Sequence, residues 1–154
     1  MPIKSFRGQL ASSTQQTIHL HTNDGSTGYR IKKLEAIQKS PGTASKDCEG
    51  LVQVWKVKQD LTDVANMSTI NFSNQTLLGI VFYSGDPAAD QYPNEFVSIF
   101  DNETFNQDIY VTYYDVRGIN DPMNYYIELE QIKLDMTQNT VATLKDIRNE
   151  TLAL

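Results

Sequence analysis

The feature that most constrains the fold of this chain is a series of short β-branched and aromatic runs, separated by turns rich in Asn, Asp and Gly. In residues 17–22, apolar and polar side chains alternate with a period of two, which is typical of a half-buried β-strand. Roughly eight to ten strands at this spacing, without the helices of a parallel sheet, predict a mainly β protein, an antiparallel β-sandwich of jelly-roll-like type. Further extended runs occupy 29–37, 51–58, 77–83, 95–100, 108–114 and 125–134.

The last of these runs changes its pattern partway along. Ile127 and Leu129 share one face, whereas Ile132 and Leu134 share the other. Either a β-bulge lies near 130–131, or the end of the strand is covered on its opposite face.

A helical period appears only at the C-terminus. Val141, Leu144 and Ile147 recur every three residues, which predicts a short amphipathic helix whose apolar stripe is placed to cover the end of the last strand. The 154 residues are enough for one hydrophobic core. We therefore expect a single domain, with the sandwich in 1–136 and the helix and tail in 137–154 packed on or beside it.

The charge balance excludes one class of partner. Thirteen Lys and Arg against nineteen Asp and Glu give a net charge of −6, whereas general nucleic-acid binders need a basic surface. The charge is also uneven along the chain, because 1–58 hold nine basic and four acidic residues and 59–154 hold four and fifteen. If this difference persists in space, oppositely charged faces would suit head-to-tail packing of many copies.

Targeting and redox features are few. The start of the sequence lacks an apolar run of signal-peptide length, and nowhere do roughly 18 apolar residues follow one another. We therefore expect cytoplasmic synthesis and no membrane partner. Cys48 is the only cysteine, so an intrachain disulfide and a Cys-based zinc site are excluded.

His19 and His21 form the sharpest candidate for a metal site. Strand residues two apart share a face, as in cupin-type metal sites. Such sites also need a Glu a few residues later and a third His, whereas here Asp24 is the nearby carboxylate and the chain holds two His. The pair lies opposite the apolar face of Ile18 and Leu20, so a solvated strand face is the favoured interpretation and no metal is expected.

A dense series of oxygen-bearing side chains runs from Asp101 to Asp108, which suits calcium. The EF-hand template requires a Gly at its sixth position and a Glu at its twelfth, and neither is present. Asn and Asp also favour turns through bonds to their own backbone. A structural turn is therefore the favoured interpretation, with calcium binding as the alternative.

Residues suited to covalent catalysis are scarce. The sequence has no Gly-x-Ser-x-Gly motif and no phosphate- or dinucleotide-binding loop. Cys48 lies between Asp47 and Glu49, and neighbouring carboxylates raise the pKa of a thiol. Glu128 and Glu130 share a strand face, as glycosidase carboxylates can, but acidic pairs on outward faces are common. We predict no enzyme activity, no catalytic residue and no cofactor.

Five of the eight tyrosines fall in two runs that we expect to pair with each other. Tyr113 and Tyr125 are in phase with apolar neighbours, so they should fill the core. Tyr110, Tyr114 and Tyr126 then face the other way, toward solvent, a partner chain or a ligand.

Four segments carry a family resemblance: Pro2–Gly8, Phe100–Thr112, Asn124–Glu130 and Ala142–Asn149. Together they resemble a largely uncharacterised group of short proteins encoded by marine bacteriophages. The resemblance spans nearly the whole chain, although 39–75 and 84–95 carry little of it. It implies a phage origin, synthesis in the host cytoplasm and a place in the virion, and it offers no catalytic motif to carry over.

We therefore expect a non-enzymatic structural protein of the virion, a decoration or cement protein of the capsid. Its partners would be copies of itself, including as a trimer, and the major capsid protein. The docking elements would be the N-terminal segment, with Ile3 and Phe6, and the C-terminal helix, with Leu144 and Ile147. The alternative is a carbohydrate- or receptor-binding module of a vertex spike, tail or fibre, and a third hypothesis is a cupin-like metal enzyme.

Overall fold

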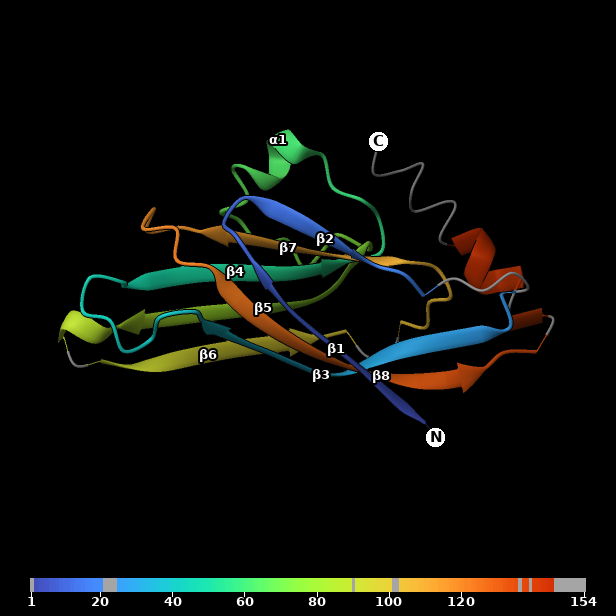
Figure 1. Ribbon diagram of the computed structural model, residues 1–154. Helices are drawn as coiled ribbons and strands as arrows, with labels where there is room; N and C mark the ends of the chain where they lie inside the picture. The colour runs from blue at the N-terminus through green and yellow to red at the C-terminus, as the bar shows by residue number, and fades with distance from the viewer. Residues whose placement is uncertain are drawn as a thin grey trace.

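Two antiparallel sheets pack face to face and enclose the hydrophobic core (Figure 1). The computed structural model describes residues 2–20, 25–89, 91–100, 103–135, 137–138 and 140–145. One sheet has the strand order β1 (Ile3–Leu10), β8 (Met123–Lys133) and β3 (Thr27–Gln38). The other has the order β2 (Thr14–Ile18), β7 (Ile109–Asp115), β4 (Cys48–Trp55), β5 (Leu77–Asp86) and β6 (Gln91–Ile99). The prediction of a mainly β, antiparallel sandwich is confirmed.

The strand order follows from winding one long antiparallel hairpin around itself. In such a hairpin β1 pairs with β8, β2 with β7, β3 with β6 and β4 with β5, and winding then places β8 beside β3 and β7 beside β4, which gives a jelly roll. This chain forms all of these neighbours except β3–β6, because β6 pairs with β5 instead. β3 and β6 lie close to each other, but no strand pairing joins the two sheets along this side.

The alternating runs locate most strands correctly, but they do not predict β1 or the two short helices. β1 shows a weak pattern because only Phe6 and Leu10 on its inward face are large and apolar. The single-turn helix α1 (Leu61–Val64) is capped by Asp60, whose carboxylate accepts the Thr62 N–H at 2.9 Å. Such a short helix leaves no periodic signal. A short 3-10 helix, Pro87–Ala89, joins β5 to β6.

The core lies between the inward faces of the two sheets. β5 is buried on both faces at its start, as its uninterrupted apolar run predicts. Its outer face is covered because Met67, from the long connection after β4, packs on a second apolar cluster of Trp55, Leu77 and Ile80. The main core includes Val52, Val54, Val81, Ile109, Val111, Tyr113, Ile127 and Leu129.

The irregularity expected in β8 lies in its partner strand. A register shift places the β-bulge in β3, between Ile31 and Lys33, and not near 130–131, so that location was wrong. The second alternative holds for the end of the strand: Leu134 is buried, and its side chain lies 3.0 Å from where a Cβ on Gly28 would be. The bulge divides β3 into two halves, 27–31 and 33–38.

Helical residues 137–138 and 140–145 confirm the predicted C-terminal helix, but not the face that it buries. Ala142 is buried, whereas Val141 and Leu144 are 59% and 60% exposed. The expected apolar stripe therefore faces solvent, because the small alanine allows the closest approach to the sandwich. Ile147 lies outside the described residues. Among the described residues, neither this helix nor α1 has the length and apolar content needed to cross a membrane.

Candidate functional site: a cleft between the two sheets

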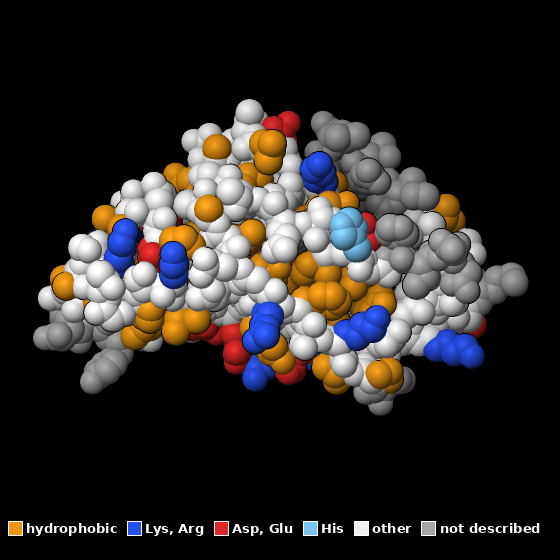
Figure 2. Space-filling view, in the orientation of Figure 1, with side chains coloured by type: hydrophobic (Ala, Val, Ile, Leu, Met, Phe, Trp, Pro, Cys, Tyr) orange, Lys and Arg blue, Asp and Glu red, His pale blue; other side chains and the backbone are white. Residues whose placement is uncertain are grey.

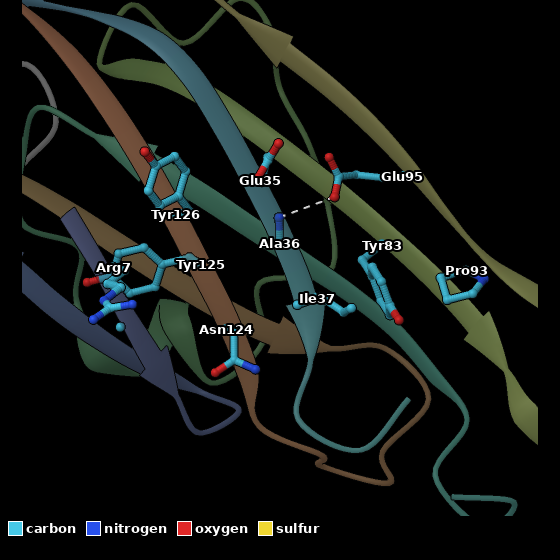
Figure 3. A pocket seen from close by; sticks show the side chains of 11 residues that line it. Arg7, Glu35, Ala36, Ile37, Tyr83, Pro93, Glu95, Asn124, Tyr125 and Tyr126 are labelled. Atoms are coloured by element: carbon cyan, nitrogen blue, oxygen red, sulfur yellow. Dashed lines mark hydrogen bonds between the residues drawn. The ribbon is translucent and has the colours of Figure 1, made fainter. Parts of the chain in front are cut away.

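A cleft of about 810 Å³ opens where the β3–β6 pairing is missing (Figure 3). On one side, the three-stranded sheet supplies Asn124, Tyr125 and Tyr126 of β8, together with most of the residues that pair with them on β1 and β3. The five-stranded sheet supplies Tyr83 of β5 and Glu95 of β6 on the other side. The cleft exists because β6 follows β5 and leaves the outer edge of β3 without a paired strand.

Gly8 fixes the position of the Tyr125 ring in the cleft wall. A Cβ on Gly8 would lie 2.9 Å from the Tyr125 hydroxyl oxygen and 3.0 Å from a ring carbon, so a larger residue would displace the ring. The hydroxyl donates to Gln16 Oε1 of β2 at 2.6 Å and thereby ties the two sheets together. Because the ring leans over β1, the other side of Tyr125, toward Ala36, is left open to the cleft.

Backbone groups of β3 face this cleft. The Ala36 N–H points away from β8 and donates to Glu95 Oε2 at 3.2 Å (Figure 3). Alternate residues of a strand direct their N–H and C=O groups to opposite neighbours, so Leu34 and Gln38 present theirs to the same edge. The Glu95 carboxylate therefore takes the place that a β6 carbonyl would occupy in a complete jelly roll.

Two buried polar atoms beside the cleft have no hydrogen-bond partner among the described residues: the Tyr83 hydroxyl and Gln38 Oε1. They lie 3.4 and 3.1 Å from where a Cβ on Gly85 would be, and the Tyr83 hydroxyl appears between Ile37 and Pro93 in Figure 3. Burial raises the pKa of Tyr83, although the nearby Gln38 backbone N–H lowers it, so the hydroxyl keeps its proton. A buried donor without an acceptor costs about 1–3 kcal/mol, unless water or a ligand accepts the bond.

A hydrogen-bonded cluster closes the end of β3 behind Tyr83. Asp121 Oδ2 accepts from Gln38 Nε2 at 3.0 Å and from the Ser40 N–H at 2.9 Å. The Tyr113 hydroxyl donates to the Asp121 carbonyl at 2.6 Å and lies 3.6 Å from Cys48 Sγ. Burial raises the pKa of the Cys48 thiol to about 11. The predicted direction is confirmed, but burial contributes more than the neighbouring carboxylates do.

The tyrosines predicted to form one interface lie on different faces. The prediction that their two runs pair was wrong, because the connection from β7 to β8 crosses from one sheet to the other. Tyr110 and Tyr114 lie on the outer face of the five-stranded sheet, where Tyr110 packs on the second apolar cluster. Tyr126 lies on the other sheet and lines the cleft. Tyr113 and Tyr125 are buried in the core, as predicted.

The predicted docking residues lie outside the cleft. Ile3 and Phe6 are on β1, at the edge of the three-stranded sheet; Ile3 is 52% exposed, and Phe6 is half-buried against the core. Figure 2 shows hydrophobic side chains gathered between β1 and β2, with Lys and Arg side chains around them. Leu144 is exposed on the terminal helix. The structure does not bring these three residues to one site.

The predicted histidine pair is only partly described. His19 follows the end of β2, and its Nδ1 lies 3.3 Å from Asp108 Oδ2 with the imidazole 76% exposed. Asp108 Oδ1 also accepts the Leu20 N–H at 2.8 Å. His21 lies outside the described residues. Within the described ranges, no three His, Cys, Asp or Glu side chains are grouped as metal ligands would be.

Residues 103–108, the described part of the acidic stretch that begins at Asp101, form a strap along the free edge of the first half of β3. Tyr29 and Phe105 exchange two backbone hydrogen bonds, at 2.8 and 3.0 Å. Their rings stack with centroids 6.3 Å apart. Asn106 is fully buried and its amide donates to the Gly25 carbonyl at 3.1 Å.

Ion pairs fasten this strap. Glu103 lies 3.0 Å from Lys56 Nζ and 2.8 Å from Lys145 Nζ of the terminal helix. The Lys56 side chain is only 1% exposed, so the Glu103 carboxylate stabilises a buried charge. Burial raises the pKa of Glu103, but the two ammonium groups lower it further, and the net pKa is below the ordinary value. These bonds give residues 103–108 a structural role, and calcium binding by the stretch from Asp101 to Asp108 stays an untested alternative.

No protein-family model matches this chain, and no curated protein or solved structure matches it. The fold and the cleft therefore carry the functional inference. Of the residues that line the cleft, only Tyr126 was a predicted site residue. The others come from five strands between Arg7 and Tyr125, and the one local signal for them is Gly8 inside a strand, which indicates a close approach.

Proposed function

We propose that the protein is a non-enzymatic structural protein of a bacteriophage virion, with the role of a capsid decoration or cement protein. The observation that most supports this role is an open edge strand. Within the part of the chain that the structure describes, β6 pairs on one side only, with β5, and its Phe96 and Val97 are 57% and 37% exposed. Open apolar edges favour association with another chain, and a lattice of neighbours would cover this one.

A second apolar surface supports contact with more than one neighbour. Val141 and Leu144 lie one helical turn apart and are both exposed on the terminal helix. A decoration protein meets both further copies of itself, for example in a trimer, and the major capsid protein beneath it. The edge of β6 and this helix stripe would serve these two contacts.

The chemistry of the buried groups supports a role without catalysis. Burial raises the pKa of both Cys48 and Tyr113, which keeps the thiol and the phenol protonated and unreactive. The ion pairs of Glu103 join the strap to a strand and to the terminal helix, which is a structural use of charge.

The first test is to count this chain against the major capsid protein by quantitative mass spectrometry of purified virions from the source phage. A decoration or cement protein should be present in hundreds of copies. A few copies would indicate a vertex, neck or fibre position instead. Absence from the particle would overturn the proposal.

The edge contact is tested by the occupancy of capsids that are refilled with purified variants. Phe96→Lys should lower the occupancy strongly, because it places a charge on the open apolar edge. Leu61→Lys is the matched control, since Leu61 is 67% exposed on α1, away from β6. Equal occupancy of the two variants would exclude the β6 edge as the contact.

A second candidate function is supported by the cleft. A carbohydrate- or receptor-binding module needs a concave site with a few polar groups, and the volume of about 810 Å³ lies within the range of small-molecule sites. A low copy number in the virion would favour this candidate over the first.

A further inference from the structure

We propose that the cleft between β3 and β6 binds a neutral saccharide, an inference that rests on the second candidate function and assigns its site and ligand class. The cleft combines an unused buried donor, an accepting carboxylate, an exposed aromatic wall and a lining without excess positive charge. Each of these four features restricts the ligand.

The hydrogen-bonding groups suit hydroxyls. The Tyr83 hydroxyl is enclosed in the wall of the cleft and donates to no described residue, so a ligand that turned this hydroxyl toward its own acceptor would remove an existing penalty. Across the cleft, Glu95 uses one oxygen for the Ala36 N–H, and a carboxylate has room for further donors. A sugar hydroxyl is donor and acceptor at once, so neighbouring hydroxyls of one ring satisfy both residues.

The aromatic wall is held in place before binding. Tyr126 is half-buried, and its hydroxyl donates to Glu128 Oε1 at 2.8 Å. This bond restrains the ring at the rim of the cleft, where an aromatic side chain suits the apolar face of a pyranose. The fixed ring also lowers the entropic cost of binding.

Charge selects against acidic ligands. Glu35 and Glu95 line the cleft together with one cation, Arg7. A carboxylate or sulfate on the ligand would meet two negative groups and one positive group. Neutral hexoses and N-acetylhexosamines should therefore bind better than uronic or sialic acids.

The test uses the full chain and named probes. Glucose, galactose, mannose and N-acetylglucosamine are titrated one at a time while backbone amide resonances are followed by NMR. Binding of any of them should shift the Ala36 amide, because its hydrogen bond to Glu95 lies in the cleft. Glucuronate serves as the charged counterpart and should bind at least tenfold more weakly.

Three variants of cleft residues test whether the saccharide binds in this cleft. Tyr83→Phe removes only the unused donor and should weaken binding about tenfold. Glu95→Gln keeps the shape and should weaken binding by a similar factor. Ala36→Leu fills the cleft and should abolish binding. Tyr114→Phe is the matched control, since Tyr114 is half-buried on the outer face of the other sheet, and it should bind as the wild type does.

The outcomes distinguish the two levels of the proposal. A saccharide that binds Tyr83→Phe, Glu95→Gln and Ala36→Leu unchanged would keep the receptor-binding candidate and overturn the cleft as its site. A folded protein that binds none of the probes, with no hit on a glycan array, would overturn both. Tighter binding of glucuronate than of glucose would overturn the neutral ligand class.

Discussion

The two halves of β3 have free edges of opposite character. Along 27–31, the edge is closed by backbone hydrogen bonds between Tyr29 and Phe105, by stacked rings and by the ion pairs of Glu103. Along 33–38, the corresponding edge opens on the cleft, and the Ala36 N–H reaches the other sheet through a side chain, the Glu95 carboxylate.

This difference shows how one strand can serve two purposes. The β-bulge between the halves changes the register of β3 with β8. On the edge away from β8, the first half can therefore contact the strap of 103–108, while the second half faces the cleft. A strand edge that is closed by backbone bonds stabilises the sandwich. An edge that is closed by a side chain remains available to a ligand, because a side chain can move without breaking a sheet.

The largest expected effect comes from Phe105→Ala in the closed half. Phe105 is 1% exposed and stacks on Tyr29, so its removal leaves a cavity and should lower the free energy of unfolding by about 4 kcal/mol. Urea denaturation measures the change. The matched control is Phe96→Ala, which removes an exposed ring and should change stability by less than about 0.5 kcal/mol. Similar losses of unfolding free energy in the two variants would contradict the stabilising role of the closed half.

The next effect concerns acid stability. The pKa of Glu103 is lowered in the folded protein, so its contribution is complete above the ordinary carboxyl pKa and is lost as the pH falls through the lower folded value. We expect the wild type to lose stability as the pH falls below the ordinary carboxyl pKa of 4.5.

Glu103→Gln removes this dependence and takes away a carboxylate that lies 3.0 Å from the buried Lys56 ammonium. The variant should be less stable at pH 7 by about 3 kcal/mol, and the difference from the wild type should shrink at low pH. Denaturant titrations across the pH range measure both. Glu130→Gln is the control, because its partner Lys32 is exposed. A difference that grows toward low pH would refute the ion-pair explanation.

A smaller effect is expected in the open half. Glu95→Ala removes one hydrogen bond from the Ala36 N–H and should cost about 1 kcal/mol. Hydrogen exchange gives the sharper readout: the Ala36 amide should lose protection, while the Tyr29 and Phe105 amides keep theirs. Glu35→Ala is the control, because it removes a carboxylate from β3, the strand of Ala36, and keeps the bond to Glu95. Equal loss of protection in both halves would mean that the edges are not independent.

The smallest effect is expected at the hydrogen-bonded cluster beyond the cleft. The Cys48 thiol is buried with its pKa raised to about 11, so the native protein should react with iodoacetamide at pH 8 far more slowly than the unfolded chain. Glu95→Ala should leave this rate unchanged, because Asp121 closes the end of β3 separately. A faster rate in the variant would show that the opening of the cleft spreads to this end.

Local patterns were enough to predict the sandwich, because period-two alternation reports which residues face a core. They placed β3, β5, β7 and β8 close to their observed bounds. They failed where a position depends on distant residues. The bulge belongs to β3 and not to β8, and the terminal helix buries Ala142 and not Val141. Each outcome depends on packing that no single segment encodes.

The site was harder to predict than the fold. The residues of its walls were not predicted, because the cleft forms only when β6 pairs with β5 and not with β3. That pairing depends on residues that are distant in the sequence. The tyrosine interface was wrong for a related reason: consecutive strands often pair, but β7 and β8 belong to different sheets. Only Gly8 carried a local signal, since its Cβ position is taken by the Tyr125 ring.

The pairing of the first strand with the last also has a consequence for synthesis. Ile3 lies opposite Glu130, so β1 has no partner until β8 has been synthesised. At typical translation rates this wait is on the order of ten seconds. During that time β4, β5 and β6, which are neighbours in both sequence and sheet, have the shortest loops to close and should assemble first. The three-stranded sheet, and with it one wall of the cleft, is then completed only when β8 emerges from the ribosome.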